Sequence, residues 1–225
     1  MAILIIVVIF AVVFLPSLWA KYILSKYSVE RAEIPGTGGE LAKHLIGACG
    51  LDEVQLERTE LGDHYDPMSK TVRLSSTNFD QKSLTAITVA AHEVGHAIQH
   101  HIGYGPLKWR TTLVGFAYYA EKLGAIVLIA LPLITLLTRT PVAGIATLII
   151  GVSVLFIPVL VHLVTLPVEF DASFNRALPI LEQRYVPLSE MPAARRILRA
   201  CALTYVAASL ATLLNIWRWL AILRR

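Results

Sequence analysis

The sequence has 225 residues, of which 56% are hydrophobic and only 16% are charged. Soluble domains typically carry about 25% charged residues, and the apolar residues here gather in long blocks, which favours an integral membrane protein. The net charge of +4 does not indicate a nucleic-acid binder, because no basic stripe with interleaved aromatic residues occurs. Cys49 and Cys201 lack C-x-x-C spacing, so we expect two free thiols, without a disulfide framework or a thiolate metal site.

Residues 1–20 contain the first apolar block. The stretch 2–20 has no charged residue, and Lys21, Lys26 and Arg31 follow it. It is long enough to span a bilayer, whereas a signal peptide carries its positive charge before the apolar run. We therefore predict a retained N-terminal transmembrane helix with its N-terminus outside the cytoplasm.

Residues 21–112 are mixed in character and predict a small α+β catalytic region. The segment "IPGTGGELAKHLIGACG" opens with a Pro/Gly turn and continues as a helix that ends at Gly50. "VQLERTEL" and "TVRLSS" alternate as strands do, and the turn-forming "GDHYDP" joins them. "SLTAITVAAHEVGHAIQHH" predicts one helix, with Asp80 or Ser83 as its N-cap.

The rest of the chain alternates apolar and polar segments. Residues 113–168 predict a transmembrane helical hairpin, 169–199 a polar helical segment and 200–225 a C-terminal transmembrane helix. Fifteen Lys and Arg residues lie in 21–112 and 169–199, which places both polar regions in the cytoplasm. The expected fold is a mainly α-helical integral membrane protein with about four transmembrane helices and a small α+β region next to them.

The segment "HEVGH" places His92 and His96 four residues apart, with Glu93 beside the first histidine. On a helix this spacing puts both imidazoles on one face, about one turn apart, where they can bind one zinc ion. Glu93 then lies near the metal and can carry a proton from an activated water to a leaving amine. The pattern predicts one Zn²⁺ per chain, with Glu93 as the general base.

Catalytic zinc usually takes three protein ligands, so a third is required. His100 lies on the same face but about 12 Å along the helix axis from His92, and it is best interpreted with His101 as a polar helix end. The extended metzincin pattern is excluded, because Gln99 stands where its glycine belongs and Ile102 where its third histidine belongs. A carboxylate from a distant segment remains.

The segment "VEFDASFNRAL" supplies such a carboxylate. It follows the third apolar block directly, and the predicted topology returns it to the side of the membrane that holds "HEVGH". Glu169 would lie at the membrane edge, where a carboxylate is costly unless it is paired or ligating. His162 lies seven residues earlier on the same helical face and either packs in the protein or faces the site.

The order of "DHYDP", "RLS", "AAHEVGHA" and "PVEFDAS" resembles the bacterial YugP-type neutral zinc metallopeptidases over almost the whole chain. The chain is also similar to membrane zinc peptidases of the HtpX and CAAX prenyl protease type. The resemblance implies a zincin-like region of the gluzincin kind, with zinc on His92, His96 and Glu169 and with Glu93 as base. Ser173 departs from the HtpX-type pattern, whose aspartate there orients a ligating histidine. Asp171 or Ser173 itself is left to do that work.

A further set of residues is predicted to contact the substrate. The strand Thr71–Ser76 precedes the metal helix and predicts a sheet edge that binds substrate as an added strand, with Arg73 at its centre; a plain sheet edge is the alternative. Tyr104, Arg176 and His162 are candidates for stabilising the oxyanion.

These features predict a membrane-embedded zinc endopeptidase in the cell membrane, multi-pass, with its active site at the cytoplasmic face. The expected partners are an unfolded or membrane-associated protein or peptide substrate and the lipid bilayer, with no nucleic acid; membrane-protein quality control is a candidate role and an oligomer is left open. The alternative is a catalytically inert membrane scaffold or adaptor with a structural zinc site. Structural zinc usually has four protein ligands, so three ligands and an acidic base favour the enzyme.

Overall fold

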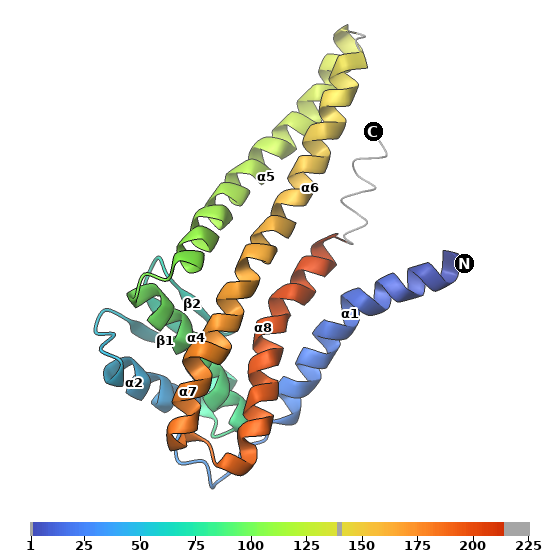
Figure 1. The fold of residues 1–225 in the computed structure, drawn as a ribbon. Helices are drawn as coiled ribbons and strands as arrows, with labels where there is room; N and C mark the ends of the chain where they lie inside the picture. The colour runs from blue at the N-terminus through green and yellow to red at the C-terminus, as the bar shows by residue number, and fades with distance from the viewer. Residues whose placement is uncertain (1, 139–140, 214–225) are drawn as a thin grey trace.

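The computed structural model describes residues 2–138 and 141–213, which are mainly helical with one small sheet (Figure 1). The helices are α1 (Ala2–Lys26), α2 (Gly38–Ala48), α3 (Ser76–Asp80), α4 (Leu84–His101), α5 (Gly105–Thr138), α6 (Pro141–Phe170), α7 (Leu178–Ile180) and α8 (Met191–Leu213). The strands are β1 (Gln55–Thr59), β2 (His64–Asp66) and β3 (Thr71–Ser75). Two π-helical segments, η1 (Asp171–Ala177) and η2 (Leu181–Tyr185), and a 3₁₀ turn, η3 (Leu188–Glu190), lie between α6 and α8. A mainly helical chain with a short sheet confirms that part of the prediction.

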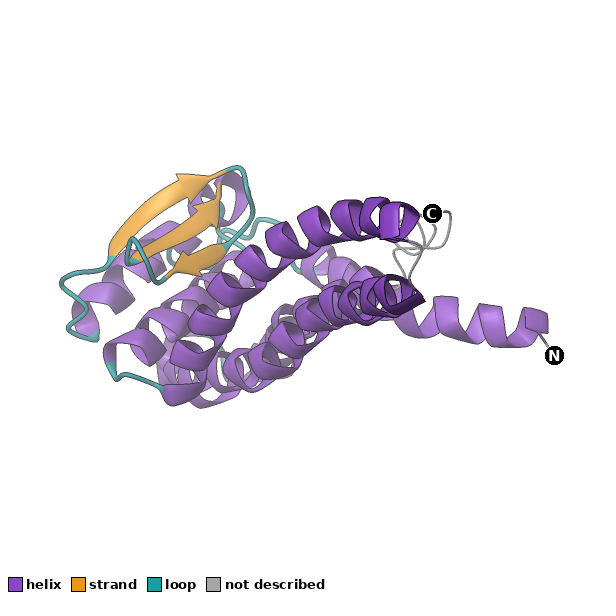
Figure 2. Ribbon diagram, turned by 90° about the horizontal axis from the view of Figure 1, so that it is seen from above, coloured by secondary structure: helices purple, strands orange, loops and turns teal. Residues whose placement is uncertain are grey.

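The long helices lie side by side and meet the sheet region at one end. α5 packs against α6, α6 against α8 and α8 against α1, and the far ends of α5 and α6 project away from the sheet (Figure 1). The sheet, α2 and α4 gather at the opposite end, and Figure 2 shows the strands at one edge of the molecule. This end contains the core that positions the histidines.

Helix α4 lies at the centre of that core. The Ser83 hydroxyl accepts a hydrogen bond from the Ala86 amide at 3.1 Å, so Ser83 is the N-cap and one of the two predicted caps is confirmed. α2 packs closely on α4, because a Cβ at Gly38 would lie 2.7 Å from the carbonyl oxygen of Ala86. Most side chains of α4 are themselves buried. The small and branched apolar ones among them include Val89, Ala90, Ala91, Val94 and Ala97.

The sheet has the strand order β1-β3-β2, with β1 parallel and β2 antiparallel to β3. Because β3 is internal, the prediction that Thr71–Ser76 offers a free edge to substrate is wrong. The predicted turn "GDHYDP" itself supplies β2. Asp63 supports the pairing of β2 with β3: its carboxylate accepts hydrogen bonds from the Ser75 amide and the Asn78 side chain, both at 2.7 Å. These bonds hold the start of β2 beside the end of β3.

The prediction of about four transmembrane helices is wrong. In the part of the chain that the structure describes, no helix is both long and apolar enough to cross a membrane. The helices do not coincide with the apolar blocks: α5 begins at Gly105 and so includes Lys108 and Arg110, and α8 begins at Met191 and includes Arg195. An apolar run can also serve to pack one helix against another, and α6 packs against both α5 and α8.

The segment after the third apolar block differs from the sequence prediction in its details. α6 continues past Pro158 to Phe170, and η1 follows at once, so Glu169 lies in the last turn of a long helix.

Cys49 is exposed, Cys201 is buried, and both are free thiols as predicted. The division of the chain at 20, 112, 168 and 199 stays a prediction, and the last residues of the predicted C-terminal helix, 214–225, lie outside the described residues.

Candidate metal centre

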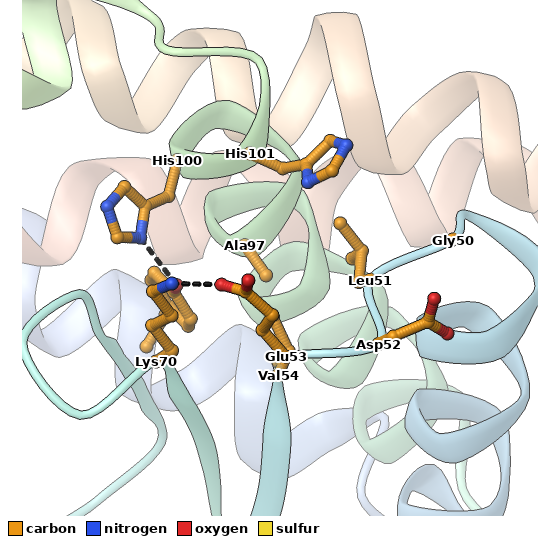
Figure 3. A pocket seen from close by; sticks show the side chains of 10 residues that line it. Gly50, Leu51, Asp52, Glu53, Val54, Lys70, Ala97, His100 and His101 are labelled. Carbon is orange, nitrogen blue, oxygen red and sulfur yellow. Dashed lines mark hydrogen bonds and ion pairs between the residues drawn. The ribbon is translucent and has the colours of Figure 1, made fainter.

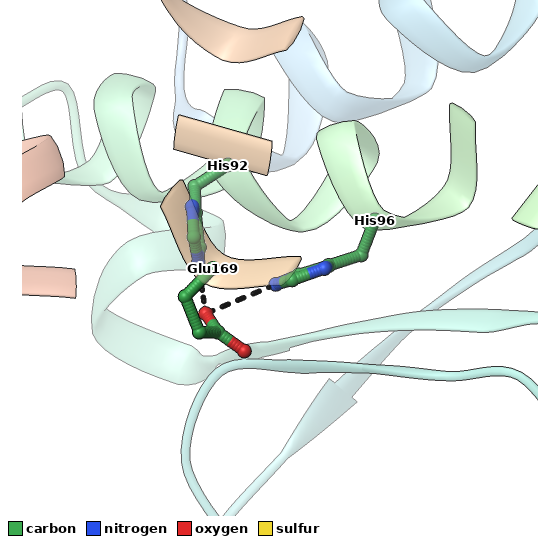
Figure 4. Close-up of side chains that lie close together, drawn as sticks. All are labelled: His92, His96 and Glu169. Carbon is green, nitrogen blue, oxygen red and sulfur yellow. Dashed lines mark hydrogen bonds and ion pairs between the residues drawn. The ribbon is translucent and has the colours of Figure 1, made fainter. Parts of the chain in front are cut away.

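Two helices bring the three predicted ligands together. α4 presents His92 and His96 on one face, with ring centroids 4.8 Å apart, and the end of α6 places Glu169 against them (Figure 4). Glu169 Oε2 lies 3.3 Å from His92 Nε2 and 3.2 Å from His96 Nε2. All three side chains are buried, and their potential ligand atoms lie within 4.8 Å of one another, so the cluster could hold a metal ion.

Gly95, inside "HEVGH", determines how closely the two segments approach. A Cβ added there would lie 2.8 Å from the carbonyl oxygen of Ala172, which would push the backbones of α4 and η1 apart. Since η1 directly follows Glu169, the glycine allows that carboxylate to reach the histidines. η1 is a π-helical turn, a feature frequent at functional sites, and it carries Asp171 and Ser173 toward α4.

Ser173 orients His92. Its hydroxyl donates a hydrogen bond to the carbonyl oxygen of Leu198 at 3.2 Å, and the same oxygen lies 3.1 Å from His92 Nδ1. Because the hydroxyl proton is used on Leu198, the oxygen accepts from Nδ1–H. His92 Nε2 is then unprotonated and faces Glu169. Of the two predicted orienting residues, Ser173 is the one that contacts His92.

Asp171 lies behind the other histidine and reaches it through Gln99. Gln99 Oε1 lies 3.0 Å from His96 Nδ1, and its amide nitrogen donates to the carbonyl oxygen of Val168 at 2.9 Å and to Asp171 Oδ2 at 2.8 Å. Arg176, five residues along the π-helical turn, donates to the same carboxylate through Nε at 3.2 Å. Burial acts to raise the pKa of Asp171, but these hydrogen bonds outweigh it and lower the pKa, so Asp171 is an anion.

Glu169 is fully buried, where an isolated anion would be costly. Burial acts to raise the pKa of its carboxyl, but when the two imidazole rings carry a second proton, the charge of His96 and the hydrogen bonds from both rings outweigh burial and lower the pKa. Its Oε1 atom has no hydrogen-bond partner among the described residues. Arg110, from α5, lies 3.5 Å from that atom and adds a positive charge to the wall of the site.

Glu93 is buried beside the cluster. Burial raises the pKa of its carboxyl to about 7; the negative charges of Glu169 and Asp63 add to this, whereas His92 and Arg110 act in the opposite direction. A carboxyl that titrates near neutrality can both accept and return a proton at physiological pH.

The donor set fits a zinc ion. The Nδ1 atoms of both rings have hydrogen-bond partners, so two Nε2 lone pairs and a carboxylate, all acceptors, converge in a buried space. Such acceptors repel one another unless positive charge lies among them. Protons on the rings can supply that charge, and so can a metal ion. Two neutral imidazoles and one carboxylate are a common ligand set of catalytic zinc.

His100 and His101 lie away from the cluster. The Tyr65 hydroxyl and His100 Nδ1 are 2.7 Å apart, and burial raises the pKa of Tyr65 to about 12. Both histidines line a pocket of about 430 Å³, where Lys70 pairs with Glu53 (Figure 3). This placement agrees with their interpretation as a polar helix end.

The remaining candidates come from different parts of the chain. Tyr104 lines a smaller pocket, of about 250 Å³, with Gln99 and His100. Arg176 pairs with Asp171, and Arg73 extends from the internal strand β3. The side chain of His162 lies outside the described residues.

Three residues that shape this site were not among the predicted site residues. Gln99 served only to exclude the metzincin class, although a glutamine three residues after His96 on a helix can reach that histidine. Gly95 carries a weaker signal, since a glycine inside a helix costs about 1 kcal/mol relative to alanine and so suggests close packing. No sequence signal connects Arg110 with Glu169, because only the packing of α5 brings them together.

The comparison with known proteins agrees with the zinc site that these residues form. Over residues 2–224 the chain matches the family described as "Putative neutral zinc metallopeptidase", and it belongs to this family, as the motifs predicted. It is 34% identical over 212 residues to "Putative membrane protease YugP" of Bacillus subtilis (strain 168), an alignment that covers 92% of this chain and 91% of that protein. No solved structure matches the chain.

Proposed function

We propose that this protein is a zinc-dependent endopeptidase with His92, His96 and Glu169 as metal ligands and Glu93 as general base. One observation carries the proposal. Two imidazole Nε2 atoms lie 3.3 and 3.2 Å from one buried carboxylate oxygen, while hydrogen bonds already occupy both Nδ1 atoms. Membership of a zinc metallopeptidase family supports it.

The mechanism assigns proton transfer to Glu93. His92, His96 and Glu169 would hold a zinc ion, which would supply a Lewis acid for the attacking water and the scissile carbonyl. Glu93 accepts the proton of the attacking water on its carboxylate and then delivers it to the nitrogen of the leaving amine. Ser173 and Gln99 keep each imidazole in the tautomer whose Nε2 can ligate.

We propose an unfolded or extended protein or peptide segment as the substrate. His92, Glu93 and His96 are at most 6% exposed, so the surface of a folded protein cannot reach them. An extended chain is thin enough to enter such a site, and backbone contacts can hold it in register without demanding one particular side chain.

We also propose that the protein associates with the cell membrane, with the metal centre at the cytoplasmic face and a role in membrane-protein quality control. The relative from Bacillus subtilis is named a membrane protease. Large apolar side chains are exposed on several helices of this chain, among them Leu15, Leu18 and Tyr22 on α1 and Phe116 and Leu123 on α5. Sedimentation with membranes after expression in bacteria tests the association, and recovery of the whole protein in the detergent-free soluble fraction contradicts it.

The test of the enzyme is hydrolysis of an unfolded, fluorescently labelled protein by the purified, zinc-loaded chain. Glu93→Gln is expected to lower the rate by at least about 100-fold, the scale of general acid–base catalysis, while the bound zinc is retained. Glu60→Gln removes an exposed carboxylate and is the matched control. Full activity in Glu93→Gln contradicts the proposed base. Bound zinc without hydrolysis by the wild type favours the inert scaffold.

A further inference from the structure

Gln99 uses every part of its side chain in a fully buried position. Its amide nitrogen contacts the carbonyl oxygen of Val168 and the carboxylate of Asp171, at 2.9 and 2.8 Å, and its Oε1 contacts His96 Nδ1 at 3.0 Å. A carbonyl and an ionised carboxylate can only accept hydrogen bonds. The nitrogen end of the amide must therefore face both of them, which leaves Oε1 toward the histidine.

This orientation determines the tautomer of His96. An amide oxygen only accepts, so Nδ1 of His96 carries the proton and Nε2 carries the lone pair. The same amide also holds Val168, whose neighbour in the chain is Glu169. One side chain on α4 thus aligns one ligand from its own helix and the backbone that delivers another ligand from α6.

We propose that Gln99 is a positioning residue that couples His96 to the Glu169 segment and so determines how tightly this chain binds zinc. The coupling is asymmetric. Behind His96 stands the Gln99 amide, which the carboxylate of Asp171 and the carbonyl oxygen of Val168 hold in place, whereas behind His92 stands the single hydroxyl of Ser173. Because more hydrogen bonds fix the partner of His96, His96 is the more firmly oriented of the two histidine ligands. The inference rests on the proposed zinc site.

A purely structural role for Gln99, as a hydrogen-bonded joint between α4 and η1, is the competing explanation. Thr85 provides the comparison, because it is also buried on α4 and donates a hydrogen bond to the carbonyl oxygen of Leu24 at 2.9 Å. Thr85 does not touch the metal ligands. Loss of either hydrogen-bonding group lowers the melting temperature of the zinc-free protein, but only loss of Gln99 is expected to weaken zinc.

The experiment measures zinc affinity by competition with a chromophoric chelator, the visible absorption of the cobalt-substituted protein, and the melting temperature without metal. Gln99→Leu is expected to weaken zinc by about 10- to 100-fold, the range for partners of ligating histidines, and to alter the cobalt spectrum. Thr85→Val is expected to leave both unchanged. Equal zinc affinity in Gln99→Leu and Thr85→Val overturns the proposal.

A double substitution keeps the test decisive if Gln99→Leu does not fold. Gln99→Glu places two carboxylates side by side and is expected to weaken zinc at least as much as Gln99→Leu. Adding Asp171→Asn gives the new carboxylate a donor again, although the bond to the Val168 carbonyl oxygen stays lost, and is expected to recover part of the affinity and of the cobalt spectrum. Lack of recovery in a folded double variant overturns the coupling. If the wild-type protein binds zinc but does not hydrolyse peptides, only the proposed function is contradicted. The inference about Gln99 is tested separately, because none of these readouts requires activity.

Discussion

The metal centre and the three-stranded sheet both hold carboxylates beside basic side chains, but their surroundings differ. In the sheet, Arg73 donates to Glu57 Oε2 and to Asp66 Oδ2, each at 3.0 Å, and all three side chains reach solvent. In the metal centre, Glu169 is fully buried against two histidines. Exposed ion pairs contribute about 0–1 kcal/mol, whereas a buried ion costs several kcal/mol unless it is compensated.

The difference shows which charged residues of this sequence point to function. Folding can use Arg73 and its partners as ordinary surface pairs, and their loss should have small, local effects. A buried acid at position 169 contributes little to folding stability, so its burial indicates a role in function.

The largest contrast is expected at the buried carboxylate itself. Glu169→Gln should weaken zinc by more than about 100-fold, beyond the range for outer partners. The zinc-free melting temperature should stay or rise, because the amide can donate to the Nε2 atoms and a buried charge is removed. Chelator competition and thermal unfolding measure the two effects. His100→Ala is the control and should keep its zinc; the reverse pattern would show that the assigned third ligand is wrong.

Gly95→Ala tests whether close packing of η1 on α4 is needed to bring Glu169 to the histidines. The added methyl would lie 2.8 Å from the Ala172 carbonyl oxygen, and overpacking of this kind typically costs about 1–3 kcal/mol. We expect the variant to unfold at lower urea concentration and to bind zinc at least about 10-fold more weakly, as for a disturbed ligand partner.

Gly47→Ala is the matched control for that variant. An added Cβ at Gly47 meets nothing within 4 Å, and alanine favours a helix over glycine by about 1 kcal/mol. The control should therefore be more stable with unchanged zinc affinity. Wild-type zinc affinity in Gly95→Ala would show that η1 can move aside without displacing the ligand.

A smaller effect is expected at the hydroxyl behind His92. Ser173→Ala removes a neutral partner, so zinc should weaken by about 10-fold, the lower end of the range for such groups, and less than in Gln99→Leu. Ser76→Ala, whose exposed hydroxyl bonds to Glu60, should leave zinc affinity unchanged. A loss in Ser173→Ala that exceeds the loss in Gln99→Leu would reverse the assigned order of the two histidines.

The smallest effect is expected in the sheet. Burial acts to raise the pKa of Asp66, but hydrogen bonds from Ser69, Met68 and Arg73 outweigh it and lower the pKa to about 2. A lowered folded-state pKa stabilises the fold above the ordinary aspartate pKa of about 3.9, and this contribution is lost as the pH falls through about 2. Asp66→Asn should therefore cost at most about 1 kcal/mol at pH 7, with the difference from wild type shrinking between pH 4 and pH 2. Urea unfolding at each pH measures it, and a tenfold loss of zinc affinity would contradict the separation of the two regions.

The metal ligands and two strands could be predicted from the sequence, because they depend on local chemistry. The spacing of His92, Glu93 and His96 needs only a helix to converge, and the helix carries its own N-cap in Ser83. Glu169 was identifiable because an acid directly after an apolar run is costly without a partner. The alternation of "VQLERTEL" and "TVRLSS" predicted two strands, which β1 and β3 confirm, since side-chain period is a local property of a strand.

Tertiary structure decided what depends on neighbours distant in the chain. Apolar blocks predict burial but not whether lipid or another helix covers them, and the helices of the structure begin and end at other residues than those blocks. Strand alternation does not specify pairing order, and β3 is internal because it pairs with β1 on one side and with β2 on the other. The roles of Gln99 and Gly95 likewise required η1 to lie against α4. The donor types and their helical spacing could be predicted from the sequence, because they follow from covalent order and local geometry. The packing of segments more than 70 residues apart determined which atoms of those donors face one another.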